Sequence, residues 1–306
     1  MKIVKIIFNF IPNQCNTLSN KKNILVTGAN GQLGMEFRKL AGKNPGYEFI
    51  FADRSELSIT DAAAIESYFS QHSFTHCINC AAYTAVDKAE TEKELAYEVN
   101  AQAPGYLAAF SKKFNAQFIH FSTDYVFDGN GTIPYTESDQ TNPIGIYGTS
   151  KLLGEKEVFK NNEQSIILRT SWVYSSYGKN FVKTMLRLMN ERESIGVVND
   201  QVGSPTYAAD LAEAILRIIS SNKEIIPGIY NYCNEGIISW YDFALEIKKL
   251  TNSKCIVNPI DTASYPTPAK RPQYSVLDAN KIKQTFGVSI PGWKESLKKC
   301  IQLLRQ

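Results

Sequence analysis

A tyrosine and a lysine four residues apart are the first side chains that could do chemistry. They are Tyr147 and Lys151, in the segment PIGIYGTSKLLGE at residues 143–155. Residues four apart share one face of a helix, so the phenol and the ammonium would be neighbours. The alternative interpretation is a surface helix with a half-buried tyrosine and a solvated lysine, and the rest of the chain decides between the two.

Such a pair suits the reduction of a carbonyl group, which needs a proton donor at the oxygen while a hydride reaches the carbon. Free tyrosine has a pKa of about 10, roughly 3 pH units or about 4 kcal/mol too weak an acid at neutral pH. The Lys151 ammonium and a cationic nicotinamide would lower the pKa of Tyr147. Lys151 could also hydrogen-bond the nicotinamide ribose. Thr123, 24 residues before Tyr147 at the end of the run QFIHFST, offers a hydroxyl to hold the carbonyl oxygen.

Glycines near the start of the chain predict a nucleotide site. The segment VTGANGQLG places Gly28, Gly31 and Gly34 in GxxGxxG spacing, after an apolar strand-like run and at the start of a helical pattern. Glycine allows a tight turn and the close approach of a pyrophosphate, and a helix N-terminus offers free N–H groups. We expect the backbone of Gly31, Gln32 and Leu33 to meet the phosphates.

The end of the second strand-like run carries residues suited to a ribose. In FADRS, Asp53 would accept from the ribose hydroxyls of NAD, whereas Arg54 would suit a 2′-phosphate, so the cofactor is NADPH or NADH. A solvated turn is the alternative. Ser58 and Ile59 are predicted near the adenine. The middle of the cofactor would be lined by small or polar residues that follow the run HCINC, where core packing is the alternative: Ala82, Tyr83 and Thr84.

Short apolar runs alternate with helical periods from Asn23 onward, which predicts βαβ units and a parallel sheet. We therefore expect an α/β fold, with a Rossmann-like doubly wound parallel sheet and a smaller, discontinuous C-terminal substrate lobe. Residues 1–22 are predicted to be an N-terminal extension. The dinucleotide-binding domain would span 23–172, with about 206–230 returning to it, and the nucleotide-sugar-binding lobe about 173–205 and 231–306.

Composition excludes several classes of function. The chain has 306 residues, 43% of them hydrophobic, and a net charge of only +3, which argues against a nucleic-acid partner. Asn9 and Pro12 interrupt the apolar N-terminal patch, so it does not resemble a signal peptide. No apolar run approaches the roughly 18 residues of a membrane helix. The six scattered cysteines are typical of reduced thiols, and we predict a cytoplasmic protein.

Together these motifs resemble the extended short-chain dehydrogenase/reductases and, within them, the dTDP-4-dehydrorhamnose reductases. Matching segments cover most of residues 23–280, and STDYVFDG, DQVGSPT and RPQYSVLD are specific to that family. The resemblance implies reduction of the C-4 keto group of dTDP-4-dehydro-L-rhamnose with NADPH or NADH, the last step of dTDP-L-rhamnose synthesis. It also implies that Thr123, Tyr147 and Lys151 form the catalytic set.

The same resemblance implies sugar contacts for Thr123, Asp124 and Trp172. A carboxylate at Asp124 can accept from sugar hydroxyls, and the Trp172 indole can stack on a pyranose face, although a core aromatic is the alternative. Tyr125 is also predicted to face the sugar. Asn180 and Arg271 are predicted to meet the dTDP pyrophosphate, while a solvated basic turn is the alternative for Arg271.

Some members of this family are dimers bridged by Mg²⁺ on glutamates, and Glu36 matches one such position. The last helical segment, KESLKKCIQLLRQ, has its only glutamate, Glu295, near its start and is otherwise basic. We therefore predict no metal site. Monomer and homodimer both stay open.

Three other functions remain possible within this fold. A sister reductase would give another epimer, such as 6-deoxy-talose. A non-catalytic NADP-binding regulatory subunit, similar to the beta subunit of methionine adenosyltransferase, would not need the intact Thr123, Tyr147 and Lys151. An epimerase or dehydratase is the third, and Tyr125 weakens it because 4,6-dehydratases usually carry a glutamate at that position.

Overall fold

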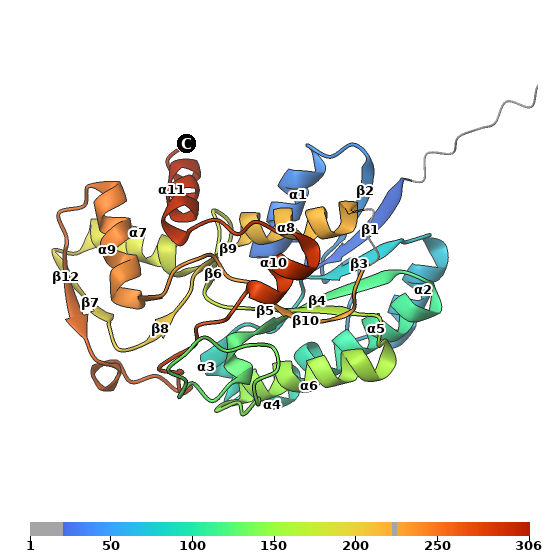
Figure 1. Ribbon diagram of the computed structural model, residues 1–306, viewed down its shortest axis with the longest axis horizontal. Coiled ribbons are helices and arrows are strands. Elements are labelled where there is room, and N and C mark those ends of the chain that lie inside the picture. Colours follow the sequence, from blue (N-terminus) through green and yellow to red (C-terminus); the bar gives the residue numbers. More distant parts are fainter. Residues whose placement is uncertain (1–20, 222–224) are drawn as a thin grey trace, which may run out of the picture.

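A parallel six-stranded sheet forms the centre of the protein, in a computed structural model that describes residues 21–221 and 225–306 (Figure 1). The strand order is β10-β5-β4-β3-β1-β2, and every neighbouring pair is parallel. The order reverses between β1 and β3, which is where doubly wound sheets bind their ligands. The predicted fold class is confirmed. The strands are β1 (Lys22–Thr27), β2 (Tyr47–Ala52), β3 (His76–Asn79), β4 (Gln117–Thr123), β5 (Ile166–Thr170) and β10 (Gly228–Asn231).

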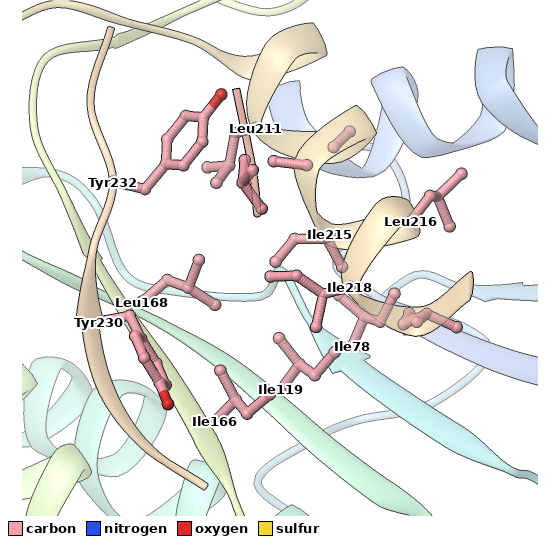
Figure 2. Packing of buried hydrophobic residues seen from close by; sticks show 14 of the residues in the cluster. Ile78, Ile119, Ile166, Leu168, Leu211, Ile215, Leu216, Ile218, Tyr230 and Tyr232 are labelled. Atoms are coloured by element: carbon pink, nitrogen blue, oxygen red, sulfur yellow. The ribbon is translucent and has the colours of Figure 1, made fainter. Parts of the chain in front are cut away.

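Helices cover both faces of this sheet and bury a separate core on each. Successive side chains of a strand point to opposite faces, so Ile24 and Val26 of β1 lie in one core and Leu25 in the other. Figure 2 shows Ile78 and Ile119 of the sheet facing a neighbouring helix. That face is covered by α1 (Gln32–Ala41), α8 (Ala208–Ser220) and α10 (Asn280–Phe286), and the other by α2 (Ala62–Gln71), α5 (Ala103–Lys113) and α6 (Ile146–Asn161).

The helical segment around Pro104 is interrupted. It consists of α4 (Lys93–Tyr97), one π-helical turn η1 (Glu98–Gln102) and then α5, with Pro104 in the first turn of α5. Proline is tolerated there because the first N–H groups of a helix have no partner within the helix. The short helix α3 (Val86–Ala89) precedes α4.

A smaller lobe packs around a core of its own, on the left of Figure 1. Its helices are α7 (Phe181–Glu191), α9 (Trp240–Thr251) and α11 (Trp293–Leu304). Its strands form two-stranded pairs: β7 (Ser194–Val198) with β12 (Ile256–Ile260), and β8 (Val202–Gly203) with β11 (Ile238–Ser239). The pair β6 (Val173–Tyr174) and β9 (Thr206–Tyr207) connects the lobes, and 3₁₀ turns occupy Asp124–Val126 (η2) and Thr262–Ser264 (η3).

The chain crosses between the lobes more often than its sequence indicated. Helix α8 and strand β10 lie with the sheet, in the region where the segment 206–230 was predicted to return. The segment 231–306 was assigned to the smaller lobe, but α10 covers the edge strand β10 and places Ile282 in the same core as Ile24 and Val26. Lys281 Nζ donates to the Ile229 carbonyl at 2.7 Å, which fastens α10 to that edge.

Across the described parts of the chain, 21–221 and 225–306, none of the helices combines the length and the apolar character that crossing a lipid bilayer requires.

Two glycines let α6, which carries Tyr147 and Lys151, approach neighbouring backbone closely. A Cβ at Gly148 would lie 2.1 Å from the Tyr125 carbonyl oxygen, and one at Gly154 would lie 2.1 Å from the Asn100 carbonyl oxygen. Neither position has room for a side chain, so α6 is held directly against η2 and η1.

We predict that Gly148→Ala destabilises the protein by about 1–3 kcal/mol, because its methyl group would overlap a backbone oxygen that cannot move aside. Urea unfolding followed by circular dichroism measures this. Gly46→Ala is the control, since nothing lies within 4 Å of its Cβ, and it should change stability by less than about 0.5 kcal/mol. Equal effects of the two substitutions would contradict the close contact of α6.

Candidate active site

The structure brings Thr123, Tyr147 and Lys151 together where β4 ends and α6 begins. The Thr123 hydroxyl donates to Asp124 Oδ1 at 2.8 Å and is also hydrogen-bonded to Tyr147. The rings of Tyr147 and Tyr125 meet edge to face, with their centres 5.5 Å apart. A hydroxyl, a phenol and an amine from two elements therefore converge at the carboxyl edge of the sheet.

The acidity of Tyr147 differs from the sequence expectation. Burial raises the pKa of Tyr147 to about 12, and the hydrogen bond with Thr123 only partly opposes this. Lys151 was expected to lower that pKa, but its Nζ donates to the Phe121 carbonyl at 2.6 Å and lies 3.3 Å from His120 Nε2. Burial lowers the pKa of Lys151 to about 8, against the opposing charge of Glu155.

Two side chains that sequence analysis missed make hydrogen bonds to α6, the helix that carries Tyr147 and Lys151. Glu90 Oε1 accepts from the Ile146 N–H at 2.9 Å, and a carboxylate is favourable at a helix N-terminus. Asn100, in the π-helical turn, donates to the Ser150 hydroxyl at 3.1 Å and bonds both the N–H and the carbonyl of Tyr83. The one sequence signal for Asn100 was a polar residue within an otherwise helical, largely buried segment.

A groove of about 470 Å³ runs along the loops that follow β1, β2 and β3. It is lined by seven of the predicted cofactor residues and by Arg54: Gly28, Gly31, Asp53, Ser58, Ile59, Ala82 and Tyr83. Five predicted cofactor residues are outside this lining as far as the described residues show: Gln32, Leu33, Thr84, Tyr147 and Lys151. Gln32 instead accepts a hydrogen bond from Asn180, and Leu33 packs against the core that contains Ile24 and Val26.

The geometry of the groove fits a dinucleotide. Gly28 has φ +64°, and a Cβ there would lie 2.5 Å from the Ala81 nitrogen, so only glycine allows this turn. Helix α1 begins after Gly31 without a side-chain cap, which leaves its first N–H groups to a phosphate. Hydrogen bonds from Ser55 lower the pKa of Asp53, and Asn30 donates to its Oδ2 at 2.7 Å, so an ionised carboxylate lies beside the exposed Arg54.

A second cavity, of about 520 Å³, lies between η2 and the smaller lobe. Tyr125 and Arg271 line it, as does Trp240, which sequence analysis missed. Asp87 orients the Arg271 guanidinium through two hydrogen bonds of 2.5 and 2.8 Å, so the arginine is not a freely solvated turn residue. The Asn180 side chain caps α7 by accepting from the Lys183 N–H.

Trp172 was expected to stack on the sugar, but its ring is packed against other residues of the protein. Its ring stacks on Trp240 with the ring centres 3.5 Å apart, and a Cβ at Gly203 would lie 2.7 Å from it. The residue has φ +48°, a conformation uncommon for a bulky side chain. Trp240 lines the second cavity, whereas Trp172 is not among its lining residues.

Asp124 directly follows Thr123 in the chain and is only 3% exposed. Burial raises its pKa to about 6. Within the described part of the chain its Oδ2 atom has no hydrogen-bond partner. The neighbouring Ser275 hydroxyl partly opposes the raised pKa, so this buried carboxyl is not without polar contacts.

The glutamate expected to match a family magnesium site does not fit a metal here. The Glu36 carboxylate is buried and accepts from the Ser175 hydroxyl at 2.6 Å, while Lys39 and Lys299 line the adjoining cavity. Glu295 pairs with Lys299 at 2.8 Å. Among the described residues there is no group of three or more His, Cys, Asp or Glu placed to hold a metal ion.

Comparison with known proteins identifies the family. Residues 22–306 match the model of the RmlD substrate binding domain. The chain belongs to the RmlD family. This confirms the resemblance to the dTDP-4-dehydrorhamnose reductases.

Individual members of the RmlD family are similar over nearly the whole chain. A dTDP-4-dehydrorhamnose reductase of Aggregatibacter actinomycetemcomitans is 44% identical, over 90% of this chain and 97% of its own. A crystal structure of a dTDP-4-dehydrorhamnose reductase from Clostridium acetobutylicum is 45% identical with a TM-score of 0.89, and covers 93% of this chain and 100% of its own. The enzyme from Bacillus anthracis, solved in complex with NADP, is 39% identical with a TM-score of 0.89, over 92% and 99%.

Asp53 and Arg54, the two charged residues that follow β2, predict how the protein distinguishes NADPH from NADH. We predict that Arg54→Ala weakens NADPH binding about tenfold, because a guanidinium suits the 2′-phosphate, and leaves NADH binding unchanged. Asp53→Asn should weaken NADH more than NADPH. Calorimetric titration with each cofactor measures both, with Arg187→Ala, on the exposed face of α7, as the control. Unchanged NADPH affinity in Arg54→Ala would contradict the assignment.

Proposed function

We propose that this protein reduces the C-4 keto group of dTDP-4-dehydro-L-rhamnose to give dTDP-L-rhamnose, with NADPH or NADH as the reductant. The observation that carries the proposal is the convergence of Thr123, Tyr147 and Lys151 at the carboxyl edge of the sheet, the edge whose loops also line the dinucleotide groove. Relatives of 44% identity bear the name of this activity, and one relative binds NADP.

In the proposed reaction each side chain of the site has a separate role. The nicotinamide supplies the hydride when it is bound. When the substrate binds, the Thr123 hydroxyl turns from Asp124 Oδ1 and donates to the sugar O4, and the Tyr147 hydroxyl gives that oxygen its proton. Once Thr123 has turned to the substrate, the Asp124 carboxylate accepts from a sugar hydroxyl. The Lys151 ammonium favours the Tyr147 phenolate that remains.

The second cavity suits the nucleotide part of the substrate. Arg271, held by Asp87, offers a planar cation to the diphosphate. Tyr125 and Trp240 supply aromatic walls for the sugar or the thymine base. Asp87 is thus a positioning residue for the diphosphate.

The proposal places the enzyme in the cytoplasm as a monomer or homodimer. All five cysteines in the described residues are unpaired, which agrees with a reducing compartment.

We predict that Tyr147→Phe lowers kcat at least a hundredfold, because no other group donates the proton, while NADPH binding is unchanged. Turnover of dTDP-4-dehydro-L-rhamnose and fluorescence titration with NADPH measure the two effects. Tyr106→Phe, on the surface of α5, is the matched control. Retention of turnover in Tyr147→Phe would remove this residue from the role of proton donor.

The raised pKa of Asp124 leads us to expect that substrate binding depends on pH. Its folded pKa of about 6 is above the ordinary value of 3.8, so the carboxylate is protonated as pH falls through about 6, becomes a weaker acceptor, and KM for the sugar nucleotide should rise. In Asp124→Asn, KM should be high and independent of pH between 5 and 7.

The same shift makes ionisation of Asp124 costly for the fold. For a carboxyl with a raised folded pKa, stability falls as pH rises from about 4 to 6, so Asp124→Asn should be more stable than the wild type at pH 7 by about 1 kcal/mol or more. Thermal unfolding at pH 4 and pH 7 measures this. A variant less stable than the wild type at pH 7 would contradict the assigned cost of burying the charge.

A further inference from the structure

A chain of buried polar side chains leads from the dinucleotide groove to Lys151. Asn79 of β3 and His120 of β4 are at most 1% exposed, and Lys151 is 2% exposed. His120 Nδ1 lies 3.0 Å from Asn79 Nδ2, and His120 Nε2 lies 3.3 Å from Lys151 Nζ. The proposed reaction gives no role to His120 or Asn79.

The direction of hydrogen bonding along this chain is fixed at its start. The Ala81 N–H donates to Asn79 Oδ1 at 3.1 Å, and the Thr27 hydroxyl donates to the same oxygen at 2.7 Å. A main-chain N–H can only donate, so the reversed Asn79 amide would place two donors face to face. The Asn79 NH₂ group therefore points at His120 and donates to Nδ1.

That donation fixes the tautomer of His120. An imidazole nitrogen that accepts carries no proton, so the neutral ring has its proton on Nε2. An imidazolium would direct a second N–H against the Asn79 donor. Burial and the neighbouring Lys151 hold the pKa of His120 well below its usual range, which agrees with a neutral ring.

The Nε2–H of His120 then points at the Lys151 nitrogen. An ammonium has three donors and no lone pair, whereas a neutral amine accepts one hydrogen bond and still donates two. We propose that His120 is a positioning residue that donates its Nε2–H to Lys151 and thereby favours the neutral amine of Lys151. The hydrogen bond from Lys151 to the Phe121 carbonyl is compatible with this arrangement.

Other charges around Lys151 act in the opposite direction or are compensated. Glu155, one turn along α6, favours the ammonium, but both its oxygens accept from Arg169 of β5, at 2.9 and 2.7 Å. Asp124 follows β4, and its Oδ1 accepts from Thr123. Tyr147, on α6, is neutral at physiological pH. Burial lowers the pKa of Lys151 to about 8, in the same direction as the His120 contact.

The consequence for catalysis rests on the proposed function. Lys151 must be an ammonium to favour the Tyr147 phenolate, and the His120 contact opposes that form. His120 therefore sets the upper limit of the pH range in which Lys151 can assist. Removal of its N–H should extend that range upward.

The tautomer can be measured directly, without any turnover. The full chain has three histidines, so two-bond ¹H–¹⁵N correlation spectra of protein with ¹⁵N-labelled histidine are simple to assign, with His120→Asn identifying the His120 signals. We expect the neutral Nε2–H tautomer of His120 between pH 6 and 8. An Nδ1–H tautomer, or an imidazolium, would overturn the proposal whatever the enzyme reduces.

The effect on Lys151 is measured by the pH profile of kcat. Asn at position 120 can still pair with Asn79 but is too short to reach Lys151. We expect the alkaline limb of the profile to move up by about one pH unit in His120→Asn. His76→Asn, another buried histidine in the sheet, is the control and should leave the limb in place.

The direction of the shift distinguishes the two possible hydrogen bonds. A downward shift in His120→Asn would mean that His120 accepts from the Lys151 ammonium, and no shift would mean that the contact has no influence on its ionisation. Either result overturns the proposal. If the protein lacks the proposed reductase activity, the tautomer measurement still decides the donor at His120, so the two failures are distinguishable.

Discussion

The burial of Lys151 between β4 and α6 is the constraint on which the rest of the site depends. An amine that is 2% exposed must find its hydrogen bonds inside the protein, and here they come from the Phe121 carbonyl and His120. This requirement links β1, β3, β4 and α6 through one polar chain that begins at Thr27. It also requires α6 to lie close to the sheet edge, which Gly148 and Gly154 permit.

Features encoded in short segments could be predicted from the sequence. The alternation of apolar runs and helical periods predicted the doubly wound sheet, because a strand covered on both faces must be apolar on both. The glycines after β1 predicted the groove, because Gly28 alone permits its turn. The spacing of Tyr147 and Lys151 predicted that they share a helix, and Thr123 stands at the end of a strand as expected.

Features that depend on distant contacts could not be predicted. The pairing of Arg271 with Asp87 joins positions 184 residues apart, and the stacking of Trp172 on Trp240 depends on how α9 packs in the smaller lobe. The low acidity of Tyr147 follows from its burial and from Lys151 turning towards His120, neither of which local spacing reveals. The return of α10 to the sheet was missed because a seven-residue helix carries little periodicity.

The most direct test is to supply dTDP-4-dehydro-L-rhamnose with NADPH or NADH, follow cofactor oxidation by absorbance, and identify the product by NMR. The convergence of Thr123, Tyr147 and Lys151 at the carboxyl edge of the sheet predicts one dTDP-L-rhamnose formed for each reduced cofactor consumed. A 6-deoxy-talose product would contradict the stereochemistry while keeping the reduction. Absence of oxidation in a protein that still binds the cofactor would contradict the enzymatic role itself and favour a regulatory subunit.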